Sequence, residues 1–205
     1  MPKPYKVQDK YFHKAKEMGY RARSAFKLLE IQEKFHLLKS GQKVLDLGAA
    51  PGSFLQVISK IVGPNGMVIG VDLKAIEPFR EKNIYTLEED IFSKDKVLDF
   101  LESFDFDKVD LVTSDLAPNT SGIRDIDQGN SAELTSEAFS IAKCFLKQNG
   151  AFVAKIFQGA DLQELLREVR KSFKKVTLYK PSATRDRSFE TYMVAIGFKP
   201  DTIGT

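Results

Sequence analysis

Lys155 is the residue of this sequence that a buried strand would accommodate least well. It interrupts the apolar run AFVAKIF, residues 151–157. An unpaired ammonium in a strand covered on both faces is costly, so this lysine must reach a pocket, pair with carboxylates or lose its proton. We interpret Lys155 as a candidate general base. The alternative is a lysine whose stem is buried and whose amine reaches solvent at the strand end.

Two carboxylates stand at the ends of other apolar runs. Asp115 follows the run 109–113, and Glu190 precedes the run 191–196. Ligands of open α/β sheets lie at the carboxyl ends of the parallel strands, and an antiparallel strand begins at that same edge. The pattern therefore predicts that Lys155, Asp115 and Glu190 converge at one edge. Each acid alone would also suit a helix cap or a surface ion pair.

A stretch of small residues follows the first apolar strand. Its sequence, VLDLGAAPGSF, covers residues 44–54 and leads into the amphipathic segment 53–62. A strand, a glycine-rich turn and a helix start are typical of the first βα unit of a doubly wound sheet. Glycines let the backbone approach a ligand, and the turn brings that ligand to unpaired N–H groups at a helix start. An ordinary strand-to-helix turn is the alternative.

Two further carboxylates follow the next strands. Asp72 ends the strand 67–71, where a carboxylate can accept hydrogen bonds from both hydroxyls of a nucleoside ribose. Asp90 comes after the short strand 84–87. It could accept a hydrogen bond from an adenine amino group, or cap the following helix.

Several common sites are missing from the sequence. Ala50 occupies the second glycine position of G-x-G-x-x-G, and no Walker A pattern occurs, which argues against dinucleotide binding and ATP hydrolysis. His13 and His36 have no metal-ligand spacing, so we predict no catalytic metal. Cys144 lies in an apolar helical run and is expected to be a small core residue.

The alternation of strands and helices predicts an α/β fold with a mostly parallel sheet covered on both faces. The segment 116–130 reads as a long polar loop and 1–18 as extended. The last two strands have no helix between them, which predicts an antiparallel pair at that edge. The expected strands are 43–47, 67–71, 84–87, 109–113, 151–157, 176–179 and 191–196, and the expected helices are 21–35, 53–62, 94–104, 131–147 and 161–173.

Charge is distributed unevenly along these 205 residues, although the net charge is only +3. Residues 1–27 hold eight Lys or Arg against two acids, with Tyr5, Tyr11, Phe12 and Tyr20 between them. Basic and aromatic residues together suit single-stranded nucleic acid, while a solvated tail is the equal alternative. No apolar run is long enough to span a membrane, and no signal peptide is visible, so we expect a cytoplasmic protein.

Five segments, taken in order, resemble the FtsJ/RlmE-type ribosomal RNA 2′-O-methyltransferases. They are RARSAFKLLEI (21–31), VLDLGAAPGSF (44–54), SDLAPNTSG (114–122), KIFQG (155–159) and KPSATRDRSFETYMVA (180–195). The resemblance implies a single-domain Rossmann-like fold that uses S-adenosyl-L-methionine, with a seven-stranded, mostly parallel sheet whose last strand is antiparallel. We expect a basic segment at 1–20, the methyltransferase domain at 21–200 and a tail at 201–205.

The resemblance also assigns site residues. The implied catalytic residues are Lys27, Asp115, Lys155 and Glu190. The implied cofactor-binding residues are Gly48, Ala49, Pro51, Gly52, Ser53, Phe54, Asp72, Leu73, Asp90, Ile91 and Asp115. Arg21, Arg23, Arg185 and Arg187 are expected to meet RNA phosphates. The family usually has P-G-G-W where this chain has PGSF, so Phe54 lacks the indole donor and Ser53 is expected to cap the helix.

The implied activity is methylation of a uridine 2′-oxygen in large-subunit ribosomal RNA, in the assembled subunit and by a monomer. Methylation of tRNA or of an mRNA cap is the alternative with the same chemistry. A catalytically silent RNA-binding assembly factor is the alternative from another class, and the intact set of four catalytic residues argues against it. A nicotinamide dehydrogenase is disfavoured by the missing dinucleotide motif.

Overall fold

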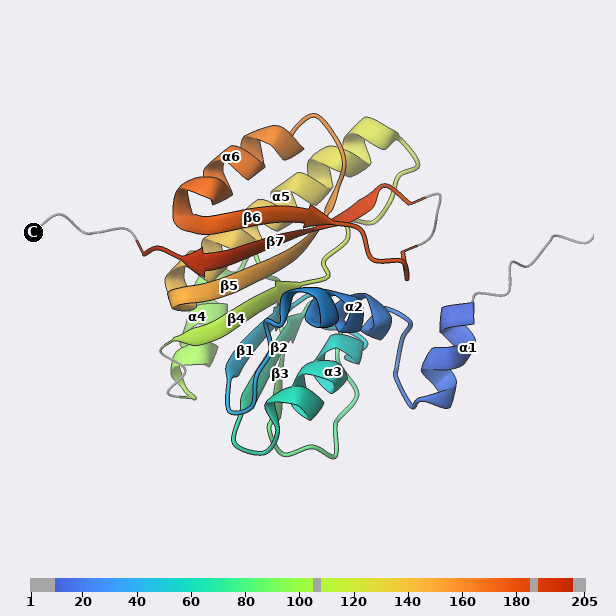
Figure 1. Ribbon diagram of the computed structural model, residues 1–205, viewed down its shortest axis with the longest axis vertical. Coiled ribbons are helices and arrows are strands. Elements are labelled where there is room, and N and C mark those ends of the chain that lie inside the picture. Colours follow the sequence, from blue (N-terminus) through green and yellow to red (C-terminus); the bar gives the residue numbers. More distant parts are fainter. Residues whose placement is uncertain (1–9, 105–107, 185–187, 201–205) are drawn as a thin grey trace, which may run out of the picture.

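The fold is a seven-stranded sheet between two layers of helices (Figure 1). The computed structural model describes residues 10–104, 108–184 and 188–200. The sheet order is β3-β2-β1-β4-β5-β7-β6. The strands are β1 (Lys43–Leu47), β2 (Met67–Asp72), β3 (Ile84–Glu88), β4 (Val109–Ser114), β5 (Leu146–Phe157), β6 (Phe173–Tyr179) and β7 (Glu190–Phe198).

Strand directions follow the expected pattern. The neighbours β3, β2, β1, β4 and β5 run parallel, whereas β7 pairs antiparallel with both β5 and β6. The predicted antiparallel last strand is confirmed. It lies inside the sheet, between β5 and the edge strand β6. Because β7 runs opposite to the parallel strands, its first residue stands at the edge where those strands end.

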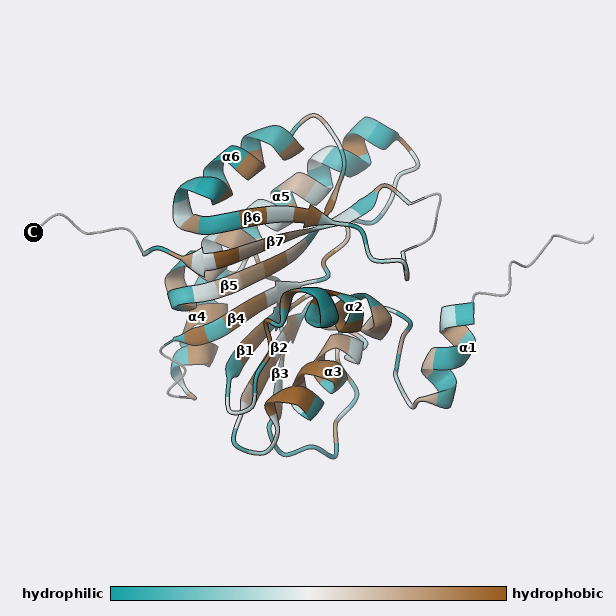
Figure 2. Ribbon diagram, in the orientation of Figure 1, coloured by the Kyte–Doolittle hydropathy of each residue, from teal (hydrophilic) through white to brown (hydrophobic). Residues whose placement is uncertain are grey.

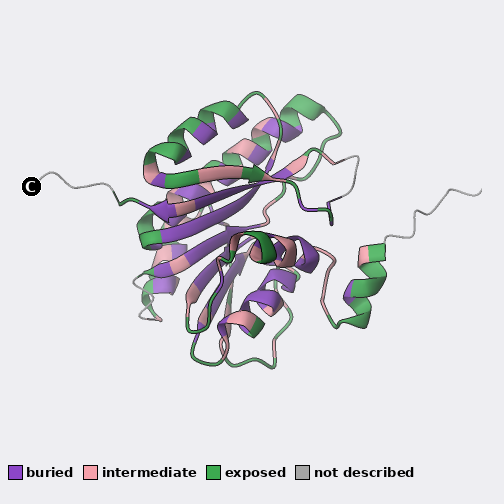
Figure 3. Ribbon diagram, in the orientation of Figure 1, coloured by how far each residue is buried: buried purple, intermediate pink, exposed green. Residues whose placement is uncertain are grey.

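Two apolar cores hold the helices to the sheet. Alternate residues of each strand face opposite sides, which gives each side its own cluster. One side carries α4 (Lys94–Glu102), α5 (Arg124–Phe145) and α6 (Leu162–Ser172), and the other carries α2 (Ala25–Phe35) and α3 (Ser53–Val62). Hydropathy and burial follow this division: the central strands are apolar and buried, the edge strands β3 and β6 are partly exposed, and the polar faces of the helices are exposed (Figures 2 and 3).

Helix boundaries differ from the sequence expectation in three places. A helix, α1 (Lys10–Glu17), lies where an extended segment was expected, and it packs Ala15 against α2. The expected loop 116–130 ends early, because α5 begins at Arg124 and the carboxylate of Asp127 accepts hydrogen bonds from the Ser121 N–H (2.7 Å) and the Gly122 N–H (3.2 Å). The expected helix at 21–35 begins only at Ala25.

Two smaller expectations were also wrong. The strand β5 begins at Leu146, in a segment expected to end the preceding helix. Cys144 is exposed, because it lies on the outer side of the last turn of α5. No helix in the described part of the chain is long and apolar enough to cross a bilayer.

Candidate active site

Lys155 and Asp115 form a buried ion pair at the carboxyl edge of the sheet. The Lys155 side chain is 5% exposed, and its Nζ lies 3.1 Å from Asp115 Oδ1. The same amine donates a 2.5 Å hydrogen bond to the backbone carbonyl of Asp115. A buried ammonium is thus paired, as the sequence required, and its amine is held at the point where β4 ends.

A second ion pair joins α2 to the first residue of β7. Lys27 Nζ lies 2.9 Å from Glu190 Oε2, with side-chain exposures of 8% and 22%. Lys155 and Glu190 point to the side of the sheet that carries α2. Lys155 stands two residues from Val153 and Glu190 two residues from Tyr192, and both of these pack in the apolar core on that side, here called the α2-side cluster. Lys27 is close enough to Asp115 for its charge to lower the pKa of that carboxyl, so Lys155, Asp115 and Glu190 lie together at one edge as predicted, and Lys27 joins them.

Tyr192 is a site residue that sequence reasoning missed. It is fully buried, pairs across strands with Lys155, and donates a 2.5 Å hydrogen bond to Asp115 Oδ1. The ammonium of Lys27 lies 5.7 Å from the centre of its ring. Burial raises the pKa of Tyr192 well above its ordinary value, and Asp115 raises it further, so the hydroxyl remains a donor. A signal was available, because Tyr192 stands two residues after Glu190 on the same face.

The charge state of Asp115 is set by its neighbours. Burial by itself would raise the pKa of Asp115, but the ammonium groups of Lys155 and Lys27 and the Tyr192 hydroxyl outweigh it, and the pKa is lowered. Asp115 is therefore a carboxylate at neutral pH. Together the two ion pairs form a compact cluster with no net formal charge, able to hold or move a proton at Lys155 Nζ.

Asp46 contrasts with Asp115. Its side chain is fully buried, its Oδ1 accepts a 2.6 Å hydrogen bond from Thr113, and its Oδ2 finds no partner among the described residues. Burial raises the pKa of Asp46 well above its ordinary value, and the charges of Asp115 and Asp72 raise it further. The shift favours the neutral form of this carboxyl, which stands in β1 two residues before Gly48.

The glycine-rich turn needs glycine at two positions. Gly48 and Gly52 have φ angles of 75° and 105°, in the left-handed region that favours glycine. A Cβ on Gly48 would stand 2.7 Å from the side chain of Leu116, and one on Gly52 would clash with the ring of Phe79. The backbone of Gly48, Ala49 and Pro51 is thereby held in a tight turn at the start of α3.

The other residues expected to bind the cofactor follow β2 and β3, at the same edge of the sheet as this turn. Asp72 accepts hydrogen bonds from the N–H groups of Ala50 (2.9 Å) and Lys74 (2.8 Å), which ties the end of β2 to the turn. Asp90 accepts from the Phe92 N–H at 3.0 Å. Leu73 is 68% exposed, and Ile91 is buried at 4%. Two acids with apolar side chains beside them fit a nucleoside, whose hydroxyls need acceptors and whose base needs apolar cover.

Ser53 and Phe54 do not behave as expected from the sequence. The expected cap is wrong, because Gly52 occupies the N-cap of α3 and no side chain in the described part of the chain caps this helix. Ser53 instead shares a 2.6 Å hydrogen bond with the hydroxyl of Ser24. Phe54 is 2% exposed and packs in the α2-side cluster. Its contact with a cofactor stays a prediction.

Arg21 has a structural task that the sequence did not reveal. Its guanidinium donates hydrogen bonds to three backbone carbonyls, those of Pro51 (2.9 Å), Glu77 (2.7 Å) and Pro78 (2.8 Å). The same group stacks 3.7 Å from the ring centre of Phe79. Arg21 therefore fastens the glycine-rich turn to the segment after β2. Its contact with RNA phosphates stays a prediction.

The other arginines expected at RNA are less informative. Arg23 donates a 2.8 Å hydrogen bond to the carbonyl of Ala183. Arg185 and Arg187 lie outside the described residues. Within the described ranges no three His, Cys, Asp or Glu side chains gather as metal ligands, and the expectation of no catalytic metal stays a prediction.

Comparison with known proteins places this geometry in context. The family model described as FtsJ-like methyltransferase matches residues 20–198. A protein of Syntrophobacter fumaroxidans named ribosomal RNA large subunit methyltransferase E is 45% identical over 94% of this chain and 96% of its own. A protein of Myxococcus xanthus with the same name is 43% identical over 96% and 92%.

A solved structure shares the fold as well. The crystal structure of a putative ribosomal RNA methyltransferase from Plasmodium falciparum has a TM-score of 0.77 and 28% sequence identity. The match covers 87% of this chain and 98% of the other. Sheet order, glycine-rich turn and charged cluster thus occur in a chain that matches a single family over nearly its whole length.

Proposed function

This chain belongs to the FtsJ-like methyltransferase family, and on that premise we propose that it methylates the 2′-oxygen of a uridine ribose in large-subunit ribosomal RNA, with Lys155 as the general base. The protein is a ribosomal RNA methyltransferase that uses S-adenosyl-L-methionine. The assignment of the base is supported above all by the Lys155 amine, which is buried and paired with Asp115 at the carboxyl edge of the sheet, beside the glycine-rich turn.

The reaction sets a limited task for the protein. A ribose hydroxyl is a poor nucleophile until its proton is removed. The bound cofactor supplies a methyl group already activated by the sulfonium charge. The protein therefore has to place the 2′-oxygen in line with that group and take the proton away. We propose that the Lys155 ammonium of the ion pair first gives up a proton to solvent, and that the resulting amine accepts the ribose proton at Nζ.

The remaining groups of the cluster position Lys155 and the sugar. Asp115 holds Nζ from two sides, through its carboxylate and its carbonyl. Tyr192 fixes the Asp115 carboxylate. Lys27 and Glu190 hold each other beside them, and we assign this pair to the ribose or its phosphate. Asp72 and Asp90, with Leu73 and Ile91, are assigned to the nucleoside of the cofactor.

RNA would approach from the rim formed by the segment before β7. Phe189 is 50% exposed next to Glu190, and the guanidinium of Arg124 lies 4.3 Å from its ring centre. Exposed aromatic rings and guanidinium planes are the groups on which unpaired RNA bases stack. The assembled large subunit as substrate, the cytoplasm as location and the monomeric state belong to the same proposal.

The experiment uses purified protein, labelled S-adenosyl-L-methionine, and large subunits from cells lacking the activity, with free ribosomal RNA and tRNA in parallel. We expect label in a 2′-O-methyluridine of the subunits. Lys155→Ala should lower turnover about 10²- to 10⁴-fold, as removal of a general base does, with cofactor binding retained. Turnover near that of the wild type would overturn the base assignment.

Other outcomes distinguish the alternatives. Label in tRNA or in a capped RNA alone would keep the chemistry and change the substrate. Tight cofactor binding without transfer to any RNA would favour an assembly factor. Methylation of free ribosomal RNA as fast as of subunits would remove the assembled particle from the proposal.

A further inference from the structure

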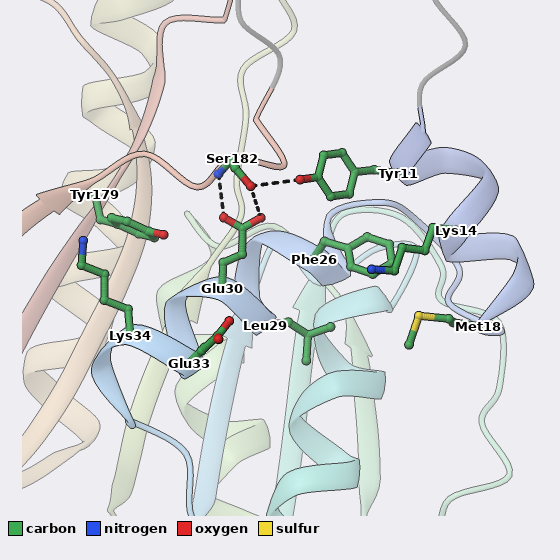
Figure 4. Close-up of a pocket in the computed structure, with 10 residues that line it drawn as sticks. All are labelled: Tyr11, Lys14, Met18, Phe26, Leu29, Glu30, Glu33, Lys34, Tyr179 and Ser182. Atoms are coloured by element: carbon green, nitrogen blue, oxygen red, sulfur yellow. Dashed lines mark hydrogen bonds between the residues drawn. The ribbon is translucent and has the colours of Figure 1, made fainter.

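An open groove runs between α1, α2 and the segment that follows β6 (Figure 4). Its volume is about 540 Å³, within the range of roughly 300–1,000 Å³ that small ligands occupy. The groove is distinct from the cluster of Lys155 and Asp115, since neither residue lines it. Its walls carry aromatic, basic and acidic side chains, among them Tyr11, Lys14, Phe26, Glu30, Lys34 and Tyr179.

Hydrogen bonds hold one wall of the groove in place. The carboxylate of Glu30 accepts from the Ser182 N–H (2.6 Å) and the Ser182 hydroxyl (2.8 Å). It also accepts from the Ala183 N–H at 3.0 Å, while the Tyr11 hydroxyl shares a 2.9 Å hydrogen bond with Ser182. Three hydrogen-bond donors thus partly neutralise the carboxylate of Glu30. It stabilises this wall of the groove and repels a bound phosphate less than a free carboxylate would.

Two pairs of a lysine and an aromatic ring line the groove. Lys34 Nζ lies 4.2 Å from the ring centre of Tyr179, and Lys14 Nζ lies 5.1 Å from that of Phe26. Both lysines are exposed, and Figure 4 shows them at opposite ends of the groove. Ammonium groups that can meet phosphates, separated by rings on which bases can stack, are the composition of a single-stranded nucleic acid site.

The groove lies next to the proposed active site. Lys27, Glu30 and Lys34 occupy one side of α2, at spacings of three and four residues. Seven residues of helix separate Lys27 from Lys34 by about 10 Å along the axis of α2. Tyr179 also pairs across strands with Tyr192. A strand of RNA leaving Lys27 along α2 would therefore enter the groove.

We propose that this groove binds an unpaired nucleotide of the RNA substrate that flanks the methylated one. The inference rests on the proposed function for its substrate, and it assigns a task to the basic and aromatic residues of α1. Tyr179 supplies the stacking surface. Lys14 and Lys34 meet the phosphates on either side, and the carboxylate of the exposed Glu33 accepts from base N–H groups.

The test measures binding, so that it does not depend on methyl transfer. A short labelled oligouridylate is titrated with the full chain at several salt concentrations. Tyr179→Ala should weaken binding about tenfold, within the range for one base–aromatic stack, and Tyr179→Phe should bind like the wild type. Lys34→Ala should reduce the slope of log K against log salt by about 0.7, the value for one phosphate of a single strand.

The matched control is Lys82→Ala. Lys82 is an exposed lysine that lines a second hollow, at the opposite edge of the sheet, where β1 and β2 begin. It should change neither the affinity nor the slope. Lys34 is exposed, so its variant tests the groove even if Tyr179→Ala proves unstable. Wild-type affinity and slope in Lys34→Ala would overturn the proposal, and so would wild-type affinity in a folded Tyr179→Ala.

A second readout separates this inference from the proposed function. If the wild type methylates large subunits, the groove variants should raise the KM for RNA and leave the KM for the cofactor unchanged. If the wild type methylates no RNA but the variants still weaken oligouridylate binding, the groove stands and the proposed function fails.

Discussion

Lys27 and Glu190 lie 163 residues apart in the chain, yet Nζ of the first is 2.9 Å from Oε2 of the second. This ion pair joins the helix α2 to the first residue of β7. It closes one side of the cluster in which Asp115 holds Lys155, so the geometry of the proposed active site depends on how α2 packs on the sheet.

The Lys27–Glu190 pair predicts a coupled loss of stability. Glu190→Gln would leave the nearly buried ammonium of Lys27 without its counter-charge and should lower the free energy of unfolding by about 2 kcal/mol. Lys27→Met together with Glu190→Gln should cost less than the two single changes added, because no charge is left unpaired. Urea unfolding of the four proteins measures the coupling. Simple additivity would show that the pair contributes little.

Tyr192→Phe isolates a single hydrogen bond. The change leaves the ring and removes the donor to Asp115 Oδ1, so a buried acceptor loses a partner. Stability should fall by about 1–2 kcal/mol. The pKa of Asp115 should rise, because one of the groups that lower it is gone. Thermal unfolding and carboxyl NMR titration check these two results, and the acid limb of the turnover profile should move to higher pH in the same variant.

Arg21→Ala predicts a defect in cofactor binding. Loss of the contacts to Pro51, Glu77 and Pro78 should loosen the glycine-rich turn and weaken S-adenosyl-L-methionine binding about tenfold. Calorimetric titration measures it. Arg80→Ala, which removes the same charge from an exposed position in the neighbouring segment, should bind like the wild type. Equal weakening in both variants would point to net charge instead.

Asp46→Asn should stabilise the protein increasingly as pH rises. The pKa of Asp46 is raised in the folded state, mainly by burial, while an unfolded aspartate titrates near pH 4. Between these two pKa values the folded protein holds a proton that the unfolded chain has released. The stabilisation that this carboxyl gives the folded state is therefore complete below about pH 4 and is lost as pH rises through the folded pKa. Asparagine resembles the neutral carboxyl. The melting-temperature difference between variant and wild type should grow from pH 4 to pH 8, and a difference independent of pH would contradict the raised pKa.

The sequence predicted most of the strands of the sheet and the charged residues at their ends. Strands were predicted within a few residues, except for the start of β5, because apolar runs bounded by turns report burial directly. Lys155 was recognisable since an ammonium is out of place in such a run. The loop expected at 116–130 is a failure of this kind of prediction. The helix α5 begins inside it, where Asp127 accepts hydrogen bonds from the N–H groups of Ser121 and Gly122, although the composition of the segment is typical of a loop.

The sequence alone determined which residue types stand at the ends of the strands, and hence that acids and a lysine meet at one edge. It did so because burial imposes an apolar period on every strand and chain direction fixes which ends meet. Tertiary structure alone decided that Tyr192 donates a hydrogen bond to Asp115, that Arg21 donates one to the carbonyl of Pro51 in the glycine-rich turn, and that α1 and α2 enclose a groove. Such contacts join residues distant in the chain through side-chain direction and hydrogen-bond geometry, which leave no local pattern.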